Sequence, residues 1–224
     1  KHLNEVFMDK IGPFLDAEDW RGSLDFGSFI IDTRRRRHDS KLFVSSLFQD
    51  QDMIWMGEIN DTGRECHRRN FRPVFEWLRE ESLPPRISAG TFTRGAISRS
   101  LKNVETAPFI VIESDSLIGY EPTTPEEKEE NKALSFGLFF YCQEKLGLHP
   151  RAVIDTGNKS LHLWFDRPPP DELAAVLRLS KGLRIDKSLL EKCQASPLRL
   201  PGTPHKDTNK KAELLFINPT AKQS

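Results

Sequence analysis

Short apolar runs alternate with helix-patterned segments through the second half of this 224-residue sequence, and that order limits the folds open to it. The runs predict β-strands, since they are brief, rich in β-branched and aromatic residues and bounded by turn-forming residues. They occupy positions 109–112, 152–155, 161–165 and 213–217. Apolar residues at helical spacing fill 133–146 and 171–179. The order strand, helix, strand, turn, strand, helix, strand predicts an α+β fold with a split mixed sheet and helices on one face.

The first hundred residues carry weaker patterns of both kinds. Helical spacing occurs at 6–15, 41–48 and 71–78, and extended segments occur at 26–32 and 53–58. Phe92 and Gly95 fall in a basic segment that predicts a loop or short strands. We therefore expect an N-terminal α/β module at 1–104 and a second module at 105–224.

Composition excludes several classes of protein. The 33 Lys and Arg residues balance 33 Asp and Glu residues, and 37% of the chain is hydrophobic, so wholesale disorder is not expected. No run approaches the roughly 18 apolar residues of a membrane-spanning helix, so we expect no membrane partner. Cys66, Cys142 and Cys193 form neither a disulfide framework nor a CxxC metal site, which indicates a reducing, cytoplasmic setting. The chain starts at Lys1, so we expect a piece of a longer polypeptide.

Charge is segregated along the chain although the net charge is zero. Positions 84–104 hold no acid and four cations, Arg86, Arg94, Arg99 and Lys102, whereas 113–130 holds seven carboxylates and a single Lys. Further basic clusters lie at Arg34 to Arg37 and at Lys206, Lys210 and Lys211. Such clusters can follow a phosphate backbone, and they can equally be solvated surface.

Two carboxylates close the apolar run at 109–112. Strand alternation turns Glu113 and Asp115 to one face, roughly 7 Å apart at the backbone. Carboxylates at a strand end are the hard oxygen ligands that Mg²⁺ or Mn²⁺ prefers, usually with substrate phosphates completing the coordination shell. The alternative is a solvated strand end, because an E-x-D pair alone is a weak motif.

A turn and the strand after it bring more polar groups together. Ser160 and His162 share a strand face, and the turn before them supplies Lys159 and the backbone N–H groups of Gly157 and Asn158. Amides, a cation and an imidazole suit phosphate oxygens. A P-loop is not expected, because its first glycine is missing and Gly157 and Lys159 are not adjacent.

A third basic element lies near the C-terminus. The segment Arg199-Leu200-Pro201-Gly202-Thr203 predicts a rigid turn, with His205 and Lys206 behind it. Arg199 and Lys206 could clamp phosphates, or the segment could be an ordinary connection between a helix and a strand.

Four features that follow one another along the chain resemble the archaeo-eukaryotic primase superfamily, in its primase-polymerase branch of bacteria, phages and plasmids. They are Glu113-x-Asp115, Ser160-x-His162, Asp186 after apolar residues, and the turn at 199–203. The family's first motif is D-x-D or D-x-E, so Glu113 departs from it, whereas Ser160 and His162 match its S-x-H motif. Asp166 competes with Asp186 for the third motif. The resemblance covers roughly positions 109–217.

The resemblance implies an RRM-like mixed sheet that carries the catalytic motifs and packs against the N-terminal α/β module, which would bind template. It implies a template-dependent nucleotidyltransferase, a DNA primase or DNA polymerase, that joins nucleoside triphosphates to a 3′-hydroxyl with two Mg²⁺ or Mn²⁺ ions. Glu113, Asp115 and Asp186 would be the catalytic metal ligands. The nucleotide would be bound by Lys159, Ser160, His162, Arg199, His205 and Lys206, and the DNA template or primer by Arg94, Arg99 and Lys102. A helicase, or a further domain of the same polypeptide, would be another partner.

Three other functions fit parts of the same pattern. The first is a catalytically inactive single-strand-binding or replication-initiator module, against which the intact carboxylates argue. The second is a metal-dependent nuclease that uses the same carboxylates and would incorporate no nucleotide. The third is an RRM-like interaction domain, for which exposed aromatic residues on the sheet would be expected. The carboxylates and His162 lie at the strand ends instead.

Overall fold

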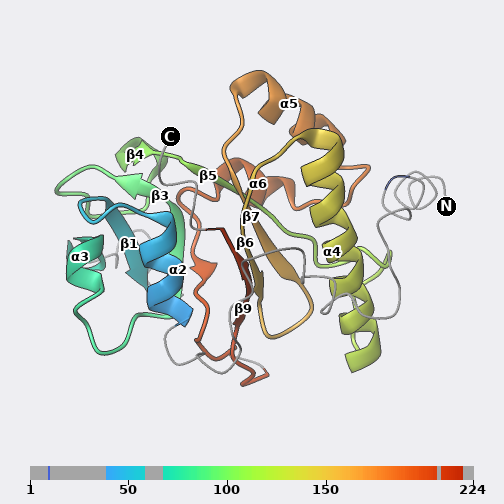
Figure 1. The fold of residues 1–224 in the computed structure, drawn as a ribbon, viewed down its shortest axis with the longest axis horizontal. Helices are drawn as coiled ribbons and strands as arrows, with labels where there is room; N and C mark the ends of the chain where they lie inside the picture. Colours follow the sequence, from blue (N-terminus) through green and yellow to red (C-terminus); the bar gives the residue numbers. More distant parts are fainter. Residues whose placement is uncertain (1–9, 11–38, 59–67, 206–207, 219–224) are drawn as a thin grey trace.

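The structure, a computed structural model, describes residue 10 and residues 39–58, 68–205 and 208–218 (Figure 1). The expected strand at 26–32, the cluster from Arg34 to Arg37, Lys206 and, apart from position 10, the expected helix at 6–15 lie outside these residues. Within the described residues, no helix combines the length and the apolar character needed to cross a bilayer.

A first sheet, here named sheet A, is built mainly from the N-terminal half. Its strand order is β2-β1-β3-β4, and β8 also pairs with β3. The strands are antiparallel to their neighbours and comprise β1 Met53–Gly57, β2 Phe71–Pro73, β3 Arg86–Phe92, β4 Val104–Thr106 and β8 Leu198–Arg199. Because β8 comes from the far end of the chain, sheet A draws on both expected modules.

Two helices and two short 3-10 helices accompany sheet A. They are α2 Asp39–Leu47, α3 Val74–Trp77, η4 Arg68–Asn70 and η5 Leu101–Asn103. The sequence predicted α2 and β1, but the helix expected at 71–78 is divided between β2 and α3. Pro73 explains the division, because a proline holds the residue before it extended and stands here as the N-cap of α3.

A second sheet, here named sheet B, has the strand order β5-β7-β6-β9. Its strands are β5 Phe109–Ile112, β6 Pro150–Asp155, β7 Leu161–Asp166 and β9 Glu213–Ile217. The α+β class is confirmed, but each described pair in sheet B is antiparallel rather than mixed. The reason is that β5 and β6 run in the same direction and β7 lies between them.

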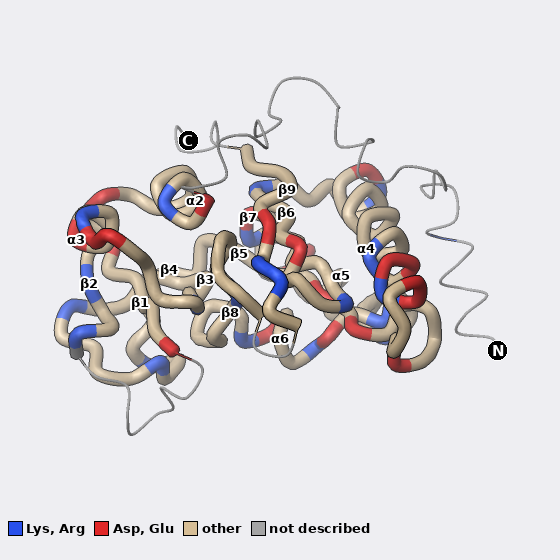
Figure 2. Tube along the Cα trace, turned by 90° about the horizontal axis from the view of Figure 1, so that it is seen from below, with Lys and Arg blue, Asp and Glu red and all other residues tan. Residues whose placement is uncertain are grey.

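Three helices connect the strands of sheet B: α4 Pro125–Leu146, α5 Pro170–Leu179 and α6 Lys187–Lys192. The helix expected from 133 begins at Pro125 because Thr124 and Glu127 form a capping box, and it ends at Gly147 in the left-handed conformation. Its first turns are acidic, as Figure 2 shows. The chain provides no periodic signal for α6, which is short.

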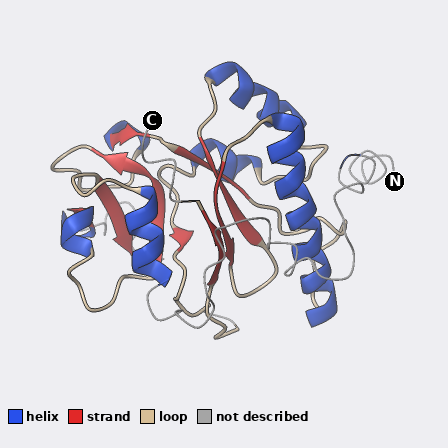
Figure 3. Ribbon diagram, viewed as in Figure 1, coloured by secondary structure: helices blue, strands red, loops and turns tan. Residues whose placement is uncertain are grey.

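The two faces of sheet B pack against different layers (Figures 1 and 3). Ile110, Ile112, Leu163 and Phe165 pack with α4 and α5, whereas Phe109, Val111, Ile154 and Trp164 pack with α2 and sheet A. Side chains alternate along a strand, so residues that continue the second set beyond the strand ends point toward sheet A. Glu113 is such a residue at the end of β5, and His162, within β7, belongs to the same set because it lies two positions before Trp164.

Candidate functional site

Glu113 is held by the two residues of the expected S-x-H motif. Ser160 Oγ donates a hydrogen bond of 2.5 Å to Glu113 Oε1, and His162 Nε2 lies 3.3 Å from the same oxygen. Burial disfavours the charged carboxylate, but His162, the Ser160 hydrogen bond and Lys159 together hold the pKa of Glu113 below its ordinary value. Glu113 is therefore a largely buried, ionised group at the end of β5.

Asp115 lies in a different environment, although it is only two residues away. Its side chain is 52% exposed and forms an ion pair of 3.2 Å with Lys159 Nζ, which also pairs with Glu121. Partial burial and the charge of Glu113 raise the pKa of Asp115 in spite of Lys159. The pKa values of the two carboxylates are thus shifted in opposite directions, and each carboxylate already has a cationic or hydrogen-bonding partner.

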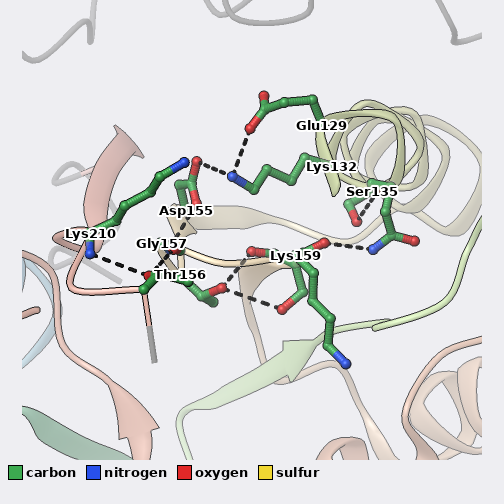
Figure 4. A network of polar contacts seen from close by, with 11 residues as sticks. Glu129, Lys132, Ser135, Asp155, Thr156, Gly157, Lys159 and Lys210 are labelled. Carbon is green, nitrogen blue, oxygen red and sulfur yellow. Dashed lines mark hydrogen bonds and ion pairs between the residues drawn. The ribbon is translucent and has the colours of Figure 1, made fainter. Parts of the chain in front are cut away.

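The turn between β6 and β7 presents Lys159 (Figure 4) and Ser160, and His162 follows as the second residue of β7. Gly157 has φ of +80°, and its N–H donates to Asp155 Oδ1 at 2.9 Å. Thr156 Oγ1 donates to the Ser160 carbonyl at 2.9 Å. These bonds close the turn on itself and fix the direction in which the β7 residues leave it.

A buried ion pair supports this turn from the side of α4. Lys132 Nζ lies 3.1 Å from Asp155 Oδ2 and 2.9 Å from Glu129 Oε1, and only 4% of the Lys132 side chain is exposed (Figure 4). Removing one partner of a buried pair leaves an uncompensated charge, which is strongly destabilising. The pair therefore contributes to the fixed position of the turn.

One pocket of about 260 Å³ collects most of the expected site residues. It lies between the end of sheet B and the edge of sheet A formed by β3 and β8. Expected residues on its wall are Glu113, Asp115, Lys159, Ser160, His162, Arg199 and His205. The apolar part of the wall includes Leu189, Pro197 and Leu198. Five of the six expected nucleotide-binding residues therefore face the same space as two of the carboxylates, and the sixth, Lys206, is outside the described residues.

Arg86 is a member of this pocket that sequence reasoning did not select. It stands directly opposite Arg199 in the pairing of β3 with β8, and both side chains line the pocket. Burial lowers the pKa of Arg86, while Glu113 and Glu58 oppose that effect. Like charges directly opposite each other on two strands repel, so the part of the pocket wall formed by these two arginines favours the binding of an anion. The sequence signal was the acid-free segment at 84–104, but the register with β8 could not be read from it.

The turn after β8 fixes the position of Arg199. Thr203 Oγ1 donates to the Leu200 carbonyl at 2.6 Å, and Gly202 has φ of +83°. Arg199 Nη1 donates to the Pro204 carbonyl at 3.0 Å, and the residue is 5% exposed. The turn predicted at 199–203 is thus present, and it holds the guanidinium against the pocket wall.

Asp186 lies beside Glu113 but is not joined to it through its carboxylate. Its backbone N–H donates to the Glu113 carbonyl at 2.8 Å, and both residues line a second hollow of about 180 Å³ with Asp115. The Asp186 side chain is the N-cap of α6, where it accepts the N–H of Leu189 at 3.0 Å. Among the described residues, no group of three or more His, Cys, Asp or Glu side chains is arranged to hold a metal ion. Glu113 and Asp115 offer suitable hard oxygens, whereas the carboxylate of Asp186 is engaged by the helix end.

Asp166, the competing residue for the third motif, is placed elsewhere. It pairs with Phe109, the first residue of β5, and its carboxylate lies 3.5 Å from Arg151 Nη1. Glu113 follows the last residue of β5, so the two acids lie at opposite ends of that strand.

The expected DNA contacts divide into two kinds. Arg94 and Lys102 are exposed, in the loop after β3 and in η5. Arg99 instead stacks over Trp55 with 4.5 Å from Cζ to the ring centroid, and its Nη1 donates to the Ala195 carbonyl at 3.2 Å. Arg99 therefore has a packing role within sheet A and its surroundings.

Comparison with known proteins gives one likeness to a solved structure. No family model matches the sequence, and no curated protein matches it. The chain is similar in structure to the AEP domain (PP-N190) of the primase-polymerase (PrimPol) of cyanophage S-2L, with 17% sequence identity and a TM-score of 0.45. The likeness covers 82% of this chain and 91% of that chain.

Proposed function

We propose that this protein is a template-directed nucleotidyltransferase of the primase-polymerase type, which joins nucleoside triphosphates to a 3′-hydroxyl. The observation that carries the proposal is the pocket in which Lys159, Ser160, His162, Arg199 and His205 meet Glu113 and Asp115. Anion-binding side chains and cation-binding side chains on one wall suit a substrate that is an anion and needs a cation. A nucleoside triphosphate is such a substrate.

The pairing of these side chains supports the proposal. Ser160 and His162 contact Glu113, and Lys159 contacts Asp115, so the groups that would hold phosphates now neutralise the groups that would hold a cation. A triphosphate alone would be repelled by the two carboxylates. When triphosphate and cation enter together, each set of side chains can exchange its partner for the ligand of opposite charge. Nucleotide and divalent cation are therefore expected to strengthen each other's binding.

Glu113 and Asp115 would hold a divalent cation, Mg²⁺ or Mn²⁺, which when bound neutralises the triphosphate and favours the ionised 3′-hydroxyl. We propose Asp186 as the third carboxylate of a two-ion site, which requires its side chain to leave the N-cap of α6. The chain's own residues then have defined tasks. His162 and Lys159 orient the phosphates from sheet B, and Arg199 with Arg86 closes the pocket from sheet A.

The DNA partner is proposed from charge. Arg94, in the loop after β3, and Lys102, in η5, are exposed cations that would contact the phosphates of a template or primer strand. Because its substrates are nucleotides and DNA, we expect the protein to act inside the cell. A helicase or a further domain of the same polypeptide would supply single-stranded template.

Incubation with Mn²⁺, a primed or unprimed template and labelled nucleotides tests the proposal. Incorporation that disappears in Asp115→Ala supports a polymerase. Shortening of labelled DNA without incorporation would assign the same carboxylates to a nuclease. Binding of single-stranded DNA with neither reaction would identify a catalytically inactive binding module.

A further inference from the structure

Asn131 lies completely buried between the two segments that carry the candidate site. It belongs to α4, and its exposed fraction is 0%. Most buried residues of α4 are apolar, so an uncharged amide at this position is an exception that needs a partner for each polar atom. The partners it has are the backbones of the two site segments.

The Asn131 amide group joins both segments at once. Nδ2 donates to the Ser114 carbonyl at 3.1 Å and to the Lys159 carbonyl at 2.7 Å. Oδ1 accepts the N–H of Leu117 at 2.6 Å. Ser114 stands between Glu113 and Asp115, and Lys159 directly precedes Ser160. Figure 4 shows the Lys159 backbone within this network.

These bonds occur where the β-ladder no longer holds the segments together. The register of β5 with β7 ends at the pair Ile112 and Leu163. Beyond that pair, the Glu113 carbonyl accepts the N–H of Asp186, and the Ser160 carbonyl accepts the N–H of Thr156. The backbones of the two segments therefore bond to other neighbours and not to each other, and the Asn131 side-chain amide bridges the two segments.

We propose that Asn131 is a positioning residue that sets the distance between the carboxylate segment and the nucleotide-binding segment. The inference rests on the proposed function, and it adds a residue that touches neither nucleotide nor cation. A side-chain amide fits this position because it supplies two donors and one acceptor. Aspartate has the same shape without the donors, and alanine has neither donors nor acceptor. Displacement of reacting groups by about 1 Å can cost roughly a hundredfold in rate.

The test compares Asn131→Ala and Asn131→Asp with Ser135→Ala. Ser135 is buried one turn along α4, and its side chain donates to the Asn131 carbonyl at 2.9 Å, within the same helix. Steady-state incorporation should show kcat about a hundredfold lower in both Asn131 variants, with the nucleotide KM changed less than about threefold. Ser135→Ala should stay within about twofold of the original protein in both constants. Asn131→Asp keeps an acceptor for Leu117, so a normal kcat in this variant would overturn the bridging role.

A second readout does not depend on activity. Amide hydrogen exchange should rise together in peptides covering 113–119 and 156–162 of Asn131→Ala, and in neither peptide of Ser135→Ala. Faster exchange confined to 113–119 would overturn the inference. If the original protein incorporates no nucleotide, the proposed function fails, and exchange alone decides whether Asn131 couples the two segments. Thermal unfolding confirms that each variant is folded. If Asn131→Ala does not fold, the isosteric Asn131→Asp variant replaces it in both measurements.

Discussion

Glu113 and Ser160 are separated by 47 positions along the chain, and a hydrogen bond of 2.5 Å joins their side chains. The same Glu113 oxygen lies 3.3 Å from His162, so one carboxylate is shared by the two residues that would grip a nucleotide. This relationship makes the ligand-free site a set of internal ion pairs and hydrogen bonds. It also makes nucleotide binding sensitive to each member of the set.

Replacement of His162 should weaken nucleotide binding while the fold is kept. Loss of a hydrogen bond to a charged group costs about 1.5 to 3 kcal/mol, so the Kd of a nucleoside triphosphate in Mn²⁺ should rise roughly tenfold or more in His162→Ala. His149→Ala is the control, because His149 is an exposed histidine before β6. Titration calorimetry measures both variants. An unchanged Kd in His162→Ala would remove this residue from the nucleotide site.

Neutralising the two strand-end carboxylates should change stability in opposite directions. The folded state raises the pKa of Asp115, so its charge costs stability above that pKa, and Asp115→Asn should raise Tm at pH 7 by less than about 3 °C. This gain should vanish as the pH falls below the ordinary value of 3.8. The pKa of Glu113 is lowered, so its charge stabilises the fold at pH 7 and Glu113→Gln should lower Tm, an effect that is lost as the pH falls through the lowered pKa. Thermal unfolding from pH 3 to pH 8 measures both, and shifts of equal sign at pH 7 would contradict the assignment.

The Gly157 turn should tolerate no side chain. A Cβ at this position would lie 2.8 Å from the Lys210 carbonyl oxygen, and φ is +80°. Gly95 is the matched control, because its φ is +85° and a Cβ there would meet nothing within 4 Å. We expect Gly95→Ala to cost about 1 kcal/mol from backbone strain alone, and Gly157→Ala about 2 to 4 kcal/mol, with reduced nucleotide binding. Denaturant unfolding that gives equal losses would show that the turn can move away from Lys210.

DNA binding should depend on the exposed cations between β3 and β4, Arg94 and Lys102, and not on Arg99, which stacks over Trp55. Neutralising Arg94 and Lys102 together should reduce the slope of log K against log salt by about 1.4 if both contact single-strand phosphates. Arg99→Gln should leave the slope unchanged and lower Tm, because Arg99 stacks over Trp55. Fluorescence anisotropy with a single-stranded oligonucleotide measures the slope, at salt concentrations from about 50 to 200 mM. This measurement distinguishes the exposed cations from the stacked Arg99. An unchanged slope in the double variant would exclude Arg94 and Lys102 from the DNA path.

Local patterns predicted the parts of this site that lie within one strand or turn. Alternation after the apolar run placed Glu113 and Asp115 together, and the turn before Leu161 predicted that Ser160 and His162 share a face. Asp186 was assigned as a metal ligand because the resemblance requires an aspartate after apolar residues, whereas in the structure its side chain is the N-cap of α6, a helix without a periodic signal in the sequence.

The parts that escaped prediction depend on contacts between distant segments. Arg86 enters the pocket only because β8 leaves the second half of the chain to pair with β3. Asn131 lies in a polar stretch that looks like a solvated helix surface, and only the packing of α4 against sheet B buries it. Neither the register of two strands from different halves nor the rotation of a helix can be deduced from local spacing.

A crystal structure of the protein soaked with Mn²⁺ and a non-hydrolysable nucleoside triphosphate tests the central claim most directly. We predict the triphosphate between Lys159, His162 and Arg199, with Mn²⁺ on Glu113 and Asp115 and with the Lys159 to Asp115 ion pair broken. A nucleotide bound elsewhere, or a nucleotide in this pocket with Glu113 still held by Ser160 and His162 and no cation on it, would contradict the account.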